Sequence, residues 1–199
     1  WSSDVCSSDL AYSSISHAGF ILLGVEAASH VGSTDASDGI ASSMTYLLLY
    51  TVLVIGTFTV VGLVAGNGDA STDLGDFRGL GRRRPALALA LTVFLLAQAG
   101  MPLTSGFVAK FGVIQSAVRT HSYAIAIIAM LASVIGAYLY LRILVSAWME
   151  DAEGEDAAPR VPFLSGLVVA AAAAFTLLVG IVPGWLLDAT RQVITLAGK

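Results

Sequence analysis

The sequence lacks most of the residues from which soluble catalytic or nucleic-acid-binding sites are built. Cys6 is the sole cysteine, so no disulfide can form within the chain and no cysteine metal cluster is indicated. Charged residues make up only 12% of the chain, and its two lysines are Lys110 and Lys199. There is no Gly-Lys-Ser/Thr phosphate-binding loop and no basic patch interleaved with aromatic residues. We therefore expect no nucleotide site and no nucleic-acid partner.

Apolar residues dominate the composition instead. They make up 56% of the 199 residues, and the mean hydropathy is +0.82, which is typical of an integral membrane protein. They fall into five segments, at about residues 10–28, 40–65, 85–118, 122–149 and 161–187. The second segment contains Tyr46, Tyr50 and Thr57 but no charge, and we expect it only to pack. The sequence thus predicts an all-α membrane protein with five transmembrane helices, the third of them discontinuous.

The discontinuity is predicted by the residues that interrupt the third segment. Pro102 has no N–H and clashes with the preceding turn, so a helix arriving from residue 86 should end or kink near Gly100. The side-chain oxygen of Thr104 or Ser105 can then cap a second half-helix. The expected break comprises Gly100, Pro102, Thr104, Ser105 and Gly106. Irregular backbone at membrane depth is tolerated only against protein or a water-filled cavity, so the break indicates a transport pathway.

Lys110 is expected in the first turns of the second half-helix. A lysine near the bilayer centre costs roughly 2.5–3.5 kcal/mol on insertion scales, so such residues usually face an internal cavity and serve a pathway. Lys110 is therefore a candidate proton relay. The alternative is a lysine whose stem is buried while its ammonium group reaches the membrane surface.

His17 is the second candidate proton relay. It lies four residues after Ser13, so the two share a helix face that we expect to pack against other helices. Histidine titrates close to physiological pH, but a histidine that only hydrogen-bonds a neighbouring helix is an equally good interpretation. Glu26 is out of phase with His17 and is expected at the membrane interface. Arg142 is expected to reach the cytoplasmic headgroups, with a relay or ion-pair role as the alternative.

The loop at residues 66–84 holds four arginines, and the positive-inside rule predicts that it is cytoplasmic. The first segment then begins inside, and Pro183, Gly184 and Trp185 end the last segment at the outer interface. Residues 1–9 are polar and serine-rich, and they fit poorly as the approach to a membrane helix. We expect residues 1–9 to be a non-native head and residues 10–199 to form the membrane domain.

Two motifs carry a resemblance to a known family. They read Ala-Tyr-Ser-Ser-Ile-Ser-His-Ala-Gly-Phe at residues 11–20 and Ala-Gly-Met-Pro-Leu-Thr-Ser-Gly-Phe-Val-Ala-Lys-Phe at residues 99–111. With Val-Gly-Ile-Val-Pro-Gly-Trp at residues 179–185, they resemble the antiporter-like membrane subunit N of bacterial NADH–quinone oxidoreductase, respiratory complex I. The sister subunits M and L differ at the position of Lys110, which favours subunit N. The resemblance covers about residues 10–199.

The resemblance implies a fold of fourteen helices with two inverted five-helix repeats, whose C-terminal part corresponds to the segments found here. It implies that Lys110 ends a hydrated row of charged residues carrying protons across the membrane, and that His17 lies near this row. The upstream glutamate and lysines of the row are missing from this sequence, so we expect the chain to be inactive alone. Cys6 to Asp9 also stand where the family has basic residues.

The resemblance also implies a function, a location and partners. The function is proton translocation coupled to electron transfer from NADH to quinone, in a multi-pass protein of the bacterial cell (inner) membrane. NADH, FMN, iron–sulfur clusters and quinone would be bound by partner subunits, with no cofactor or metal in this chain. The expected partners are the other membrane subunits of complex I and the lipid bilayer. Two alternatives stay open: a subunit of a multisubunit cation/proton antiporter, and a structural scaffold in which Lys110 only pairs with a neighbouring carboxylate.

Overall fold

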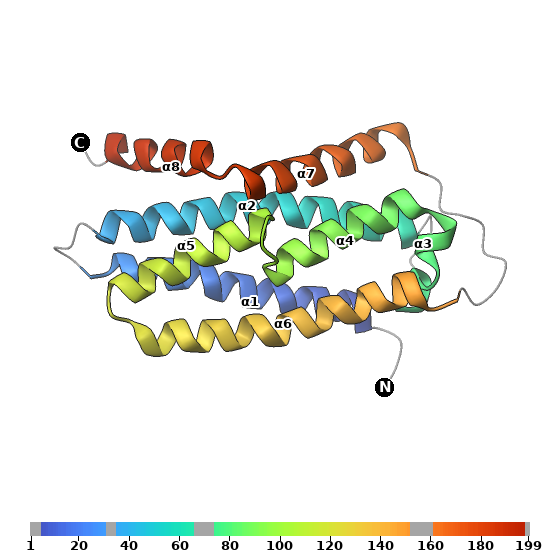
Figure 1. Cartoon of the computed structure of the whole chain (residues 1–199), viewed down its shortest axis with the longest axis horizontal. Coiled ribbons are helices and arrows are strands. Elements are labelled where there is room, and N and C mark those ends of the chain that lie inside the picture. Colours follow the sequence, from blue (N-terminus) through green and yellow to red (C-terminus); the bar gives the residue numbers. More distant parts are fainter. Residues whose placement is uncertain (1–4, 31–34, 66–73, 152–160, 198–199) are drawn as a thin grey trace.

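The computed structural model is a bundle of helices that run side by side along one long axis (Figure 1). It describes residues 5–30, 35–65, 74–151 and 161–197, and every regular element within these ranges is helical. The elements are α1 (Val5–Ala28), α2 (Asp35–Ala65), the 3₁₀ helix η1 (Leu74–Phe77), α3 (Leu80–Arg83), α4 (Pro85–Ala99), α5 (Ser105–Arg119), α6 (Tyr123–Met149), α7 (Phe163–Ile181) and α8 (Gly184–Ala197).

Within the described residues, three helices are long and apolar enough to cross a membrane by length and composition: Asp38–Ala65, Tyr123–Met149 and Phe163–Ile181. α4 is a shorter apolar helix. α4 and α5 have 15 residues each, which is about 22 Å at 1.5 Å per residue, so neither alone crosses a hydrocarbon core of about 30 Å. These findings confirm the all-helical membrane class.

The predicted interruption of the third segment is present. α4 begins with Pro85, whose missing N–H would have no partner at this position of a helix. It ends at Gly100, which has left-handed backbone with φ of 93°, and the chain then turns through Leu103, with φ of 66°. α5 begins at Ser105. The first helix, by contrast, starts at Val5 rather than near residue 10, so residues 5–9 form its first turns.

The prediction for the end of the last segment is wrong. We expected Pro183, Gly184 and Trp185 to end it at the outer interface, but the chain continues there as α8. Pro183 cannot donate a backbone hydrogen bond, and α7 ends just before it. Its carbonyl oxygen nevertheless accepts bonds from the N–H groups of Leu186 at 3.1 Å and Leu187 at 3.2 Å. Because proline is well tolerated at the start of a helix, Pro183 interrupts this segment instead of ending it (Figure 1).

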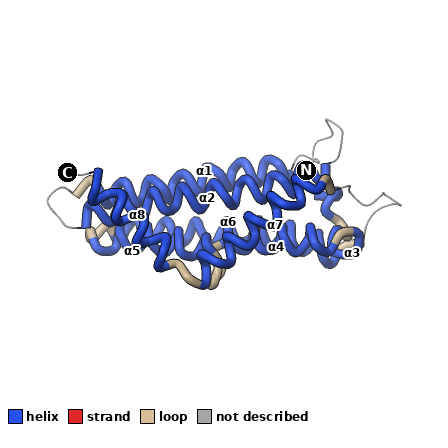
Figure 2. The backbone as a smooth tube through the Cα atoms, turned by 90° about the horizontal axis from the view of Figure 1, so that it is seen from above, coloured by secondary structure: helices blue, strands red, loops and turns tan. Residues whose placement is uncertain are grey.

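α2 lies at the centre of the packing and contacts α1, α4, α5, α7 and α8. Buried apolar side chains form two clusters along it. One includes Val60 and Phe94, on the side of α4, α6 and α7, and the other includes Phe20 and Val113, on the side of α1 and α5. The start of α1 and the end of α8 lie at opposite ends of the bundle (Figures 1 and 2).

Candidate functional site

The ends of α4 and α5 overlap sideways at the break instead of meeting end to end. A Cβ atom at Gly106 would overlap the backbone carbonyl of Ala97, so glycine is required for α5 to lie this close to the last turn of α4. A Cβ atom at Gly180 of α7 would likewise overlap the backbone of Leu103 and Thr104. The irregular backbone is therefore packed directly against protein, as its depth in a membrane would require.

In the last turn of α4, the carbonyl group of Ala99 is open to a side chain. The N–H of Gly100 donates to the carbonyl oxygens of Ala97 at 2.9 Å and Leu96 at 3.1 Å, and the N–H of Met101 donates to Leu96 at 3.0 Å. The carbonyl oxygen of Ala99 takes no part in these bonds. Because the final carbonyls of a helix have no partner within it, Ala99 can accept from elsewhere.

The first turn of α5 has no side-chain cap, and the capping prediction is wrong. Thr104 occupies the N-cap position, but its hydroxyl donates to the carbonyl oxygen of Met101 at 2.6 Å. Ser105 already has helical geometry, and its buried hydroxyl has no partner among the described residues. Pro102 lies in the turn between the two half-helices. The Thr104 hydroxyl thus stabilises the turn rather than the start of α5.

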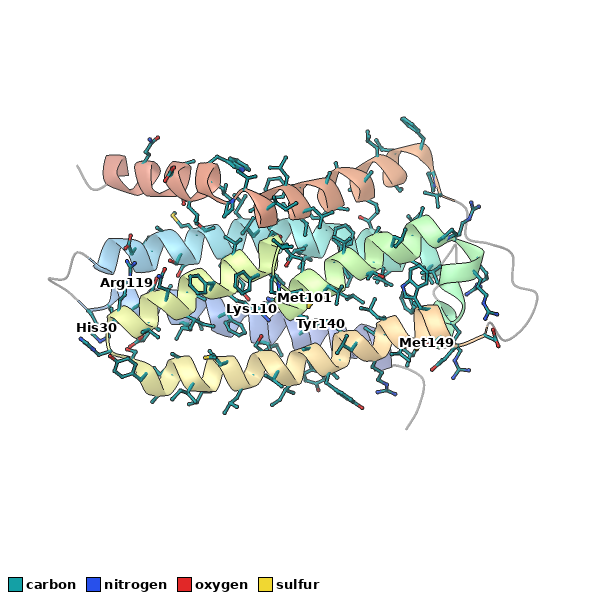
Figure 3. All side chains as sticks on the ribbon, viewed as in Figure 1. His30, Met101, Lys110, Arg119, Tyr140 and Met149 are labelled. Atoms are coloured by element: carbon teal, nitrogen blue, oxygen red, sulfur yellow. The ribbon has the colours of Figure 1, made fainter. Side chains whose placement is uncertain are left out.

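Lys110 lies in the second turn of α5 and reaches back to the end of α4. Its Nζ donates to the carbonyl oxygen of Ala99 at 3.1 Å and to the hydroxyl of Ser133 in α6 at 2.8 Å. It also lies 5.1 Å from the centroid of the Phe20 ring. Only 7% of the residue is exposed. The carbonyl end of a helix favours a cation, so the break itself offers charge compensation at a point midway along the bundle, near Met101 (Figure 3).

His17 lies in a cluster of hydroxyl groups from α1, α2 and α6. Its Nδ1 is 2.8 Å from the hydroxyl oxygen of Tyr46, and its Nε2 is 3.1 Å from that of Tyr140. The Tyr50 ring stacks on the imidazole at a centroid distance of 4.4 Å. Ser13 shares a hydrogen bond with Tyr140, so the predicted face of Ser13 and His17 packs against α6. Hydroxyl groups can donate or accept, so both the relay and the structural interpretation of His17 stay open.

Lys110 and His17 face the same interior but do not touch. Among the described residues, no hydrogen bond joins the two. The Phe20 ring contacts the ammonium of Lys110 and stacks on Tyr46 at 5.9 Å, and Tyr46 in turn bonds His17. Their partners on α6 lie two helical turns apart, about 10 Å along the axis. A proton could pass between the two residues only through water or a rearrangement.

The partners of both candidates were missed in the sequence. Tyr46 and Tyr50 were expected only to pack, and no role was predicted for Ser133. A signal was available, because Tyr46 and Tyr50 are four residues apart and Ser133 and Tyr140 seven apart, so each pair shares a helix face. Polar residues confined to one face of a membrane helix point to its protein-facing side.

The other charged candidates lie away from His17 and Lys110. Glu26 accepts a hydrogen bond from Ser122 at 2.8 Å and lies 4.0 Å from His30, so it pairs near a helix end, as expected, and not with His17. Arg142 is exposed on α6. Within the described ranges, no group of three His, Cys, Asp or Glu side chains could hold a metal ion.

Most of the described site lies in a stretch that matches a known family of membrane proteins. Residues 7–136 match the family described as NADH:quinone oxidoreductase/Mrp antiporter, TM. The chain belongs to this family. Lys110, the break and His17 all lie within the matched residues, whereas Tyr140, the partner of His17, lies just beyond them.

Relatives within the family support the predicted resemblance to subunit N. NADH-quinone oxidoreductase subunit N 3 of Streptomyces griseus is 41% identical over 184 residues, which cover 92% of this chain and 32% of that relative. The subunit N of Thermobifida fusca is 43% identical over 184 residues, covering 90% of this chain and 32% of that relative. The resemblance to subunit N is confirmed, and the chain spans about a third of the length of these curated relatives.

A solved structure shows the same arrangement of helices. A chain of respiratory complex I from Thermus thermophilus superimposes with a TM-score of 0.70 at 29% identity, covering 91% of this chain and 39% of that chain. A chain of the Mrp complex from a Dietzia species superimposes with a TM-score of 0.78 at 22% identity, covering 93% of this chain and 41% of that chain. The second likeness is one of fold alone.

Proposed function

We propose that the chain is the C-terminal part of a proton-translocating membrane subunit of NADH–quinone oxidoreductase, which couples electron transfer from NADH to quinone to proton pumping. The observation that carries the proposal is the position of Lys110. A charged side chain buried at membrane depth, on the open carbonyl end of a broken helix, is expensive to retain without a transport role. The relatives named subunit N support the same assignment.

The proposal includes five membrane crossings. They are α1, α2, the pair α4–α5, α6 and the pair α7–α8. The positive-inside rule supports a cytoplasmic position for the arginine-containing loop. The end of α8 then lies outside, consistent with its position opposite the start of α1 (Figure 2).

Lys110 and Ser133 can exchange hydrogen-bond roles as a proton arrives and leaves. When Lys110 is charged, it donates to Ser133 and to the carbonyl oxygen of Ala99, and the Ser133 hydroxyl lies 3.4 Å from the same carbonyl oxygen, to which it can donate. When Lys110 is neutral, its lone pair can accept from the Ser133 hydroxyl, since a hydroxyl donor rotates to suit its partner. The site therefore offers hydrogen bonds to both states of the lysine.

The hydroxyl cluster around His17 supplies a second place where a proton can be held. The chain Tyr46, His17, Tyr140, Ser13 consists of groups that each donate and accept. We propose that this chain relays protons to the part of the interior that holds Lys110. Each charge moved against 100 mV requires about 2.3 kcal/mol, which electron transfer in the partner subunits would supply.

The partners follow from the proposed function. NADH, FMN, iron–sulfur clusters and quinone bind to other subunits, and the chain contributes a proton path in the bacterial inner membrane. Its neighbours are other membrane subunits of complex I and the lipid bilayer. Because the upstream charged residues are not part of this chain, we propose that it is inactive alone.

The test is to tag the complete gene in its native bacterium and to purify the tagged protein with its partners. We expect it to co-purify with NADH–quinone reductase activity. Inverted vesicles from these cells should take up protons when NADH is added, and deletion of the gene should abolish that uptake. A tagged protein that purifies without any NADH-oxidising activity contradicts the proposal.

A second candidate is a subunit of a multisubunit cation/proton antiporter, favoured by the family description and by the fold likeness to the Mrp complex. It predicts sodium-dependent proton exchange in vesicles without NADH. The same tagged strain distinguishes the two, because the antiporter would retain its exchange activity when NADH oxidation is inhibited.

A further inference from the structure

A groove of about 670 Å³ runs between α4 and α7 at the end of the bundle that carries the arginine-containing loop. The two helices lie side by side there (Figure 1). Its lining is apolar apart from Arg84 and extends along α4 to Val93 and along α7 to Ala173. Small residues on both helices, such as Ala90 and Ala170, keep the groove open. It lies on a different face of the bundle from Lys110, whose partners belong to α4, α6 and α1.

The length of the groove matches one leaflet of a membrane. From Arg84 to Val93 the groove follows α4 for about 14 Å at 1.5 Å per residue. Half of a hydrocarbon core of about 30 Å is about 15 Å. An extended acyl chain entering at Arg84 would therefore end near the level of Val93, in the middle of the bundle.

Positive charge lies at the open end of the groove. Arg78 pairs with Glu150 at 2.8 Å, Arg82 pairs with Asp151, and Arg83 donates to backbone carbonyl oxygens. Arg84 is exposed, and its guanidinium group makes no hydrogen bond or ion pair with any residue of the described ranges. Of the arginines in this loop, it is the one whose guanidinium group is available to an outside anion.

The start of α4 adds to this charge. Arg84 occupies the N-cap position, Pro85 the first turn, and no side chain caps the helix. The first N–H groups of α4 thus lack side-chain partners, and a helix start favours an anion such as phosphate. Arg84 and the start of α4 together form a cationic end on an apolar groove.

We infer that this groove binds one anionic phospholipid from the leaflet on the side of the arginine-containing loop, with its phosphate on Arg84 and the start of α4 and one acyl chain between α4 and α7. The positive charge of Arg84 matches a lipid phosphate, and the length of the groove matches one acyl chain, so the occupant we infer is a phospholipid. Basic pockets between membrane helices on the cytoplasmic side bind such headgroups. The inference depends on the membrane placement of the bundle and not on proton transport.

The test uses the complete complex in vesicles that contain phosphatidylglycerol with a photoreactive group on the acyl chain. After illumination, the crosslinked peptides are identified by mass spectrometry. We expect crosslinks on α4 and α7 near Val93 and Ala173, and a fall of roughly tenfold or more in Arg84→Gln, because a lost bond to a charged group weakens binding by about that factor. The matched control Arg82→Gln, whose arginine already pairs with Asp151, should retain most of the crosslinking.

A second variant tests the apolar half of the site. Ala170→Leu fills the groove while leaving Arg84 in place, and it should reduce the crosslinks near Val93. Equal crosslinking by phosphatidylcholine and phosphatidylglycerol would overturn the role of charge. Absence of crosslinks from the groove in the wild-type complex would show that protein covers it and would overturn the inference. Because the readout is lipid capture, it is independent of NADH-driven proton uptake.

Discussion

The pairs α4–α5 and α7–α8 are both helices interrupted near a proline, yet only one of them forms a site. In α4–α5 the ends overlap sideways, with left-handed backbone at Gly100 and Leu103. In α7–α8 the second helix resumes directly from the carbonyl of Pro183, and the described residues there have no left-handed backbone. A proline is thus sufficient to break a helix, but sideways displacement is needed to open a carbonyl end inside the protein.

The two breaks also differ in what occupies them. At the first, Lys110 binds the open carbonyl of Ala99. At the second, no charged residue lies between Ile181 and Leu187. The two are in contact, because Gly180 packs on the backbone of Leu103. The second break, which holds no charged residue, therefore packs against the first break and supports it.

The largest effect is expected where the two half-helices of the first break cross. In Gly106→Ala, the added methyl would overlap the Ala97 backbone, which cannot move aside as a side chain can. We expect a loss of about 3 kcal/mol or more in the free energy of unfolding, seen as reduced amounts of the assembled complex. Gly184→Ala is the matched control at the second break, because its Cβ would meet nothing within 4 Å. Equal assembly of the two variants would contradict the account.

An intermediate effect is expected at the hydroxyl cluster beside the first break. Tyr140→Phe leaves the Ser13 hydroxyl and the Nε2 of His17 without their buried partner, while Nδ1 keeps Tyr46, and we expect a loss of about 1–3 kcal/mol in stability. If the cluster relays protons, NADH-driven uptake per quinone reduced should fall as well. Tyr138→Phe serves as the control, since Tyr138 is 68% exposed on the same helix. Thermal unfolding and proton uptake are measured on the same preparation. If Tyr140→Phe and Tyr138→Phe take up protons equally well, the cluster is not part of the proposed proton path.

The smallest effects are expected where the second halves of the two interrupted helices, α5 and α8, are joined to α2. α5 is tied to α2 by an ion pair between Arg119 and Asp38 at 2.9 Å, and α8 is tied to α2 by a hydrogen bond between Thr45 and Thr190 at 3.1 Å. Arg119→Gln and Thr190→Val should each cost about 0.5–1 kcal/mol. Only the first effect should shrink in high salt, because salt screens partly exposed charges. A salt-independent Arg119→Gln effect would refute the electrostatic explanation.

The sequence predicted what depends on local chemistry. A glycine followed two residues later by a proline is a local signal for the end of a helix, and Gly100 and Pro102 predicted the break in this way. The wrong predictions concern choices that neighbours decide. Thr104 can cap a helix start or bind the preceding turn, and its backbone packs on α7. Pro183 can end a segment or precede another helix, and here the following helix, α8, packs on α2. The partners of His17 come from α2 and α6, and no local pattern pairs residues so distant in the chain.

The central claim is that Lys110 carries protons at the break, and the most direct measurement is Lys110→Met in the complete gene. The variant removes the charge and keeps a long apolar side chain. NADH-driven proton uptake and quinone reduction are measured in sealed inverted vesicles, and assembly is checked on the same sample. The account predicts an assembled complex whose proton uptake falls sharply. An assembled complex that pumps as the wild type does would contradict it, and loss of assembly itself would favour a purely structural role for Lys110.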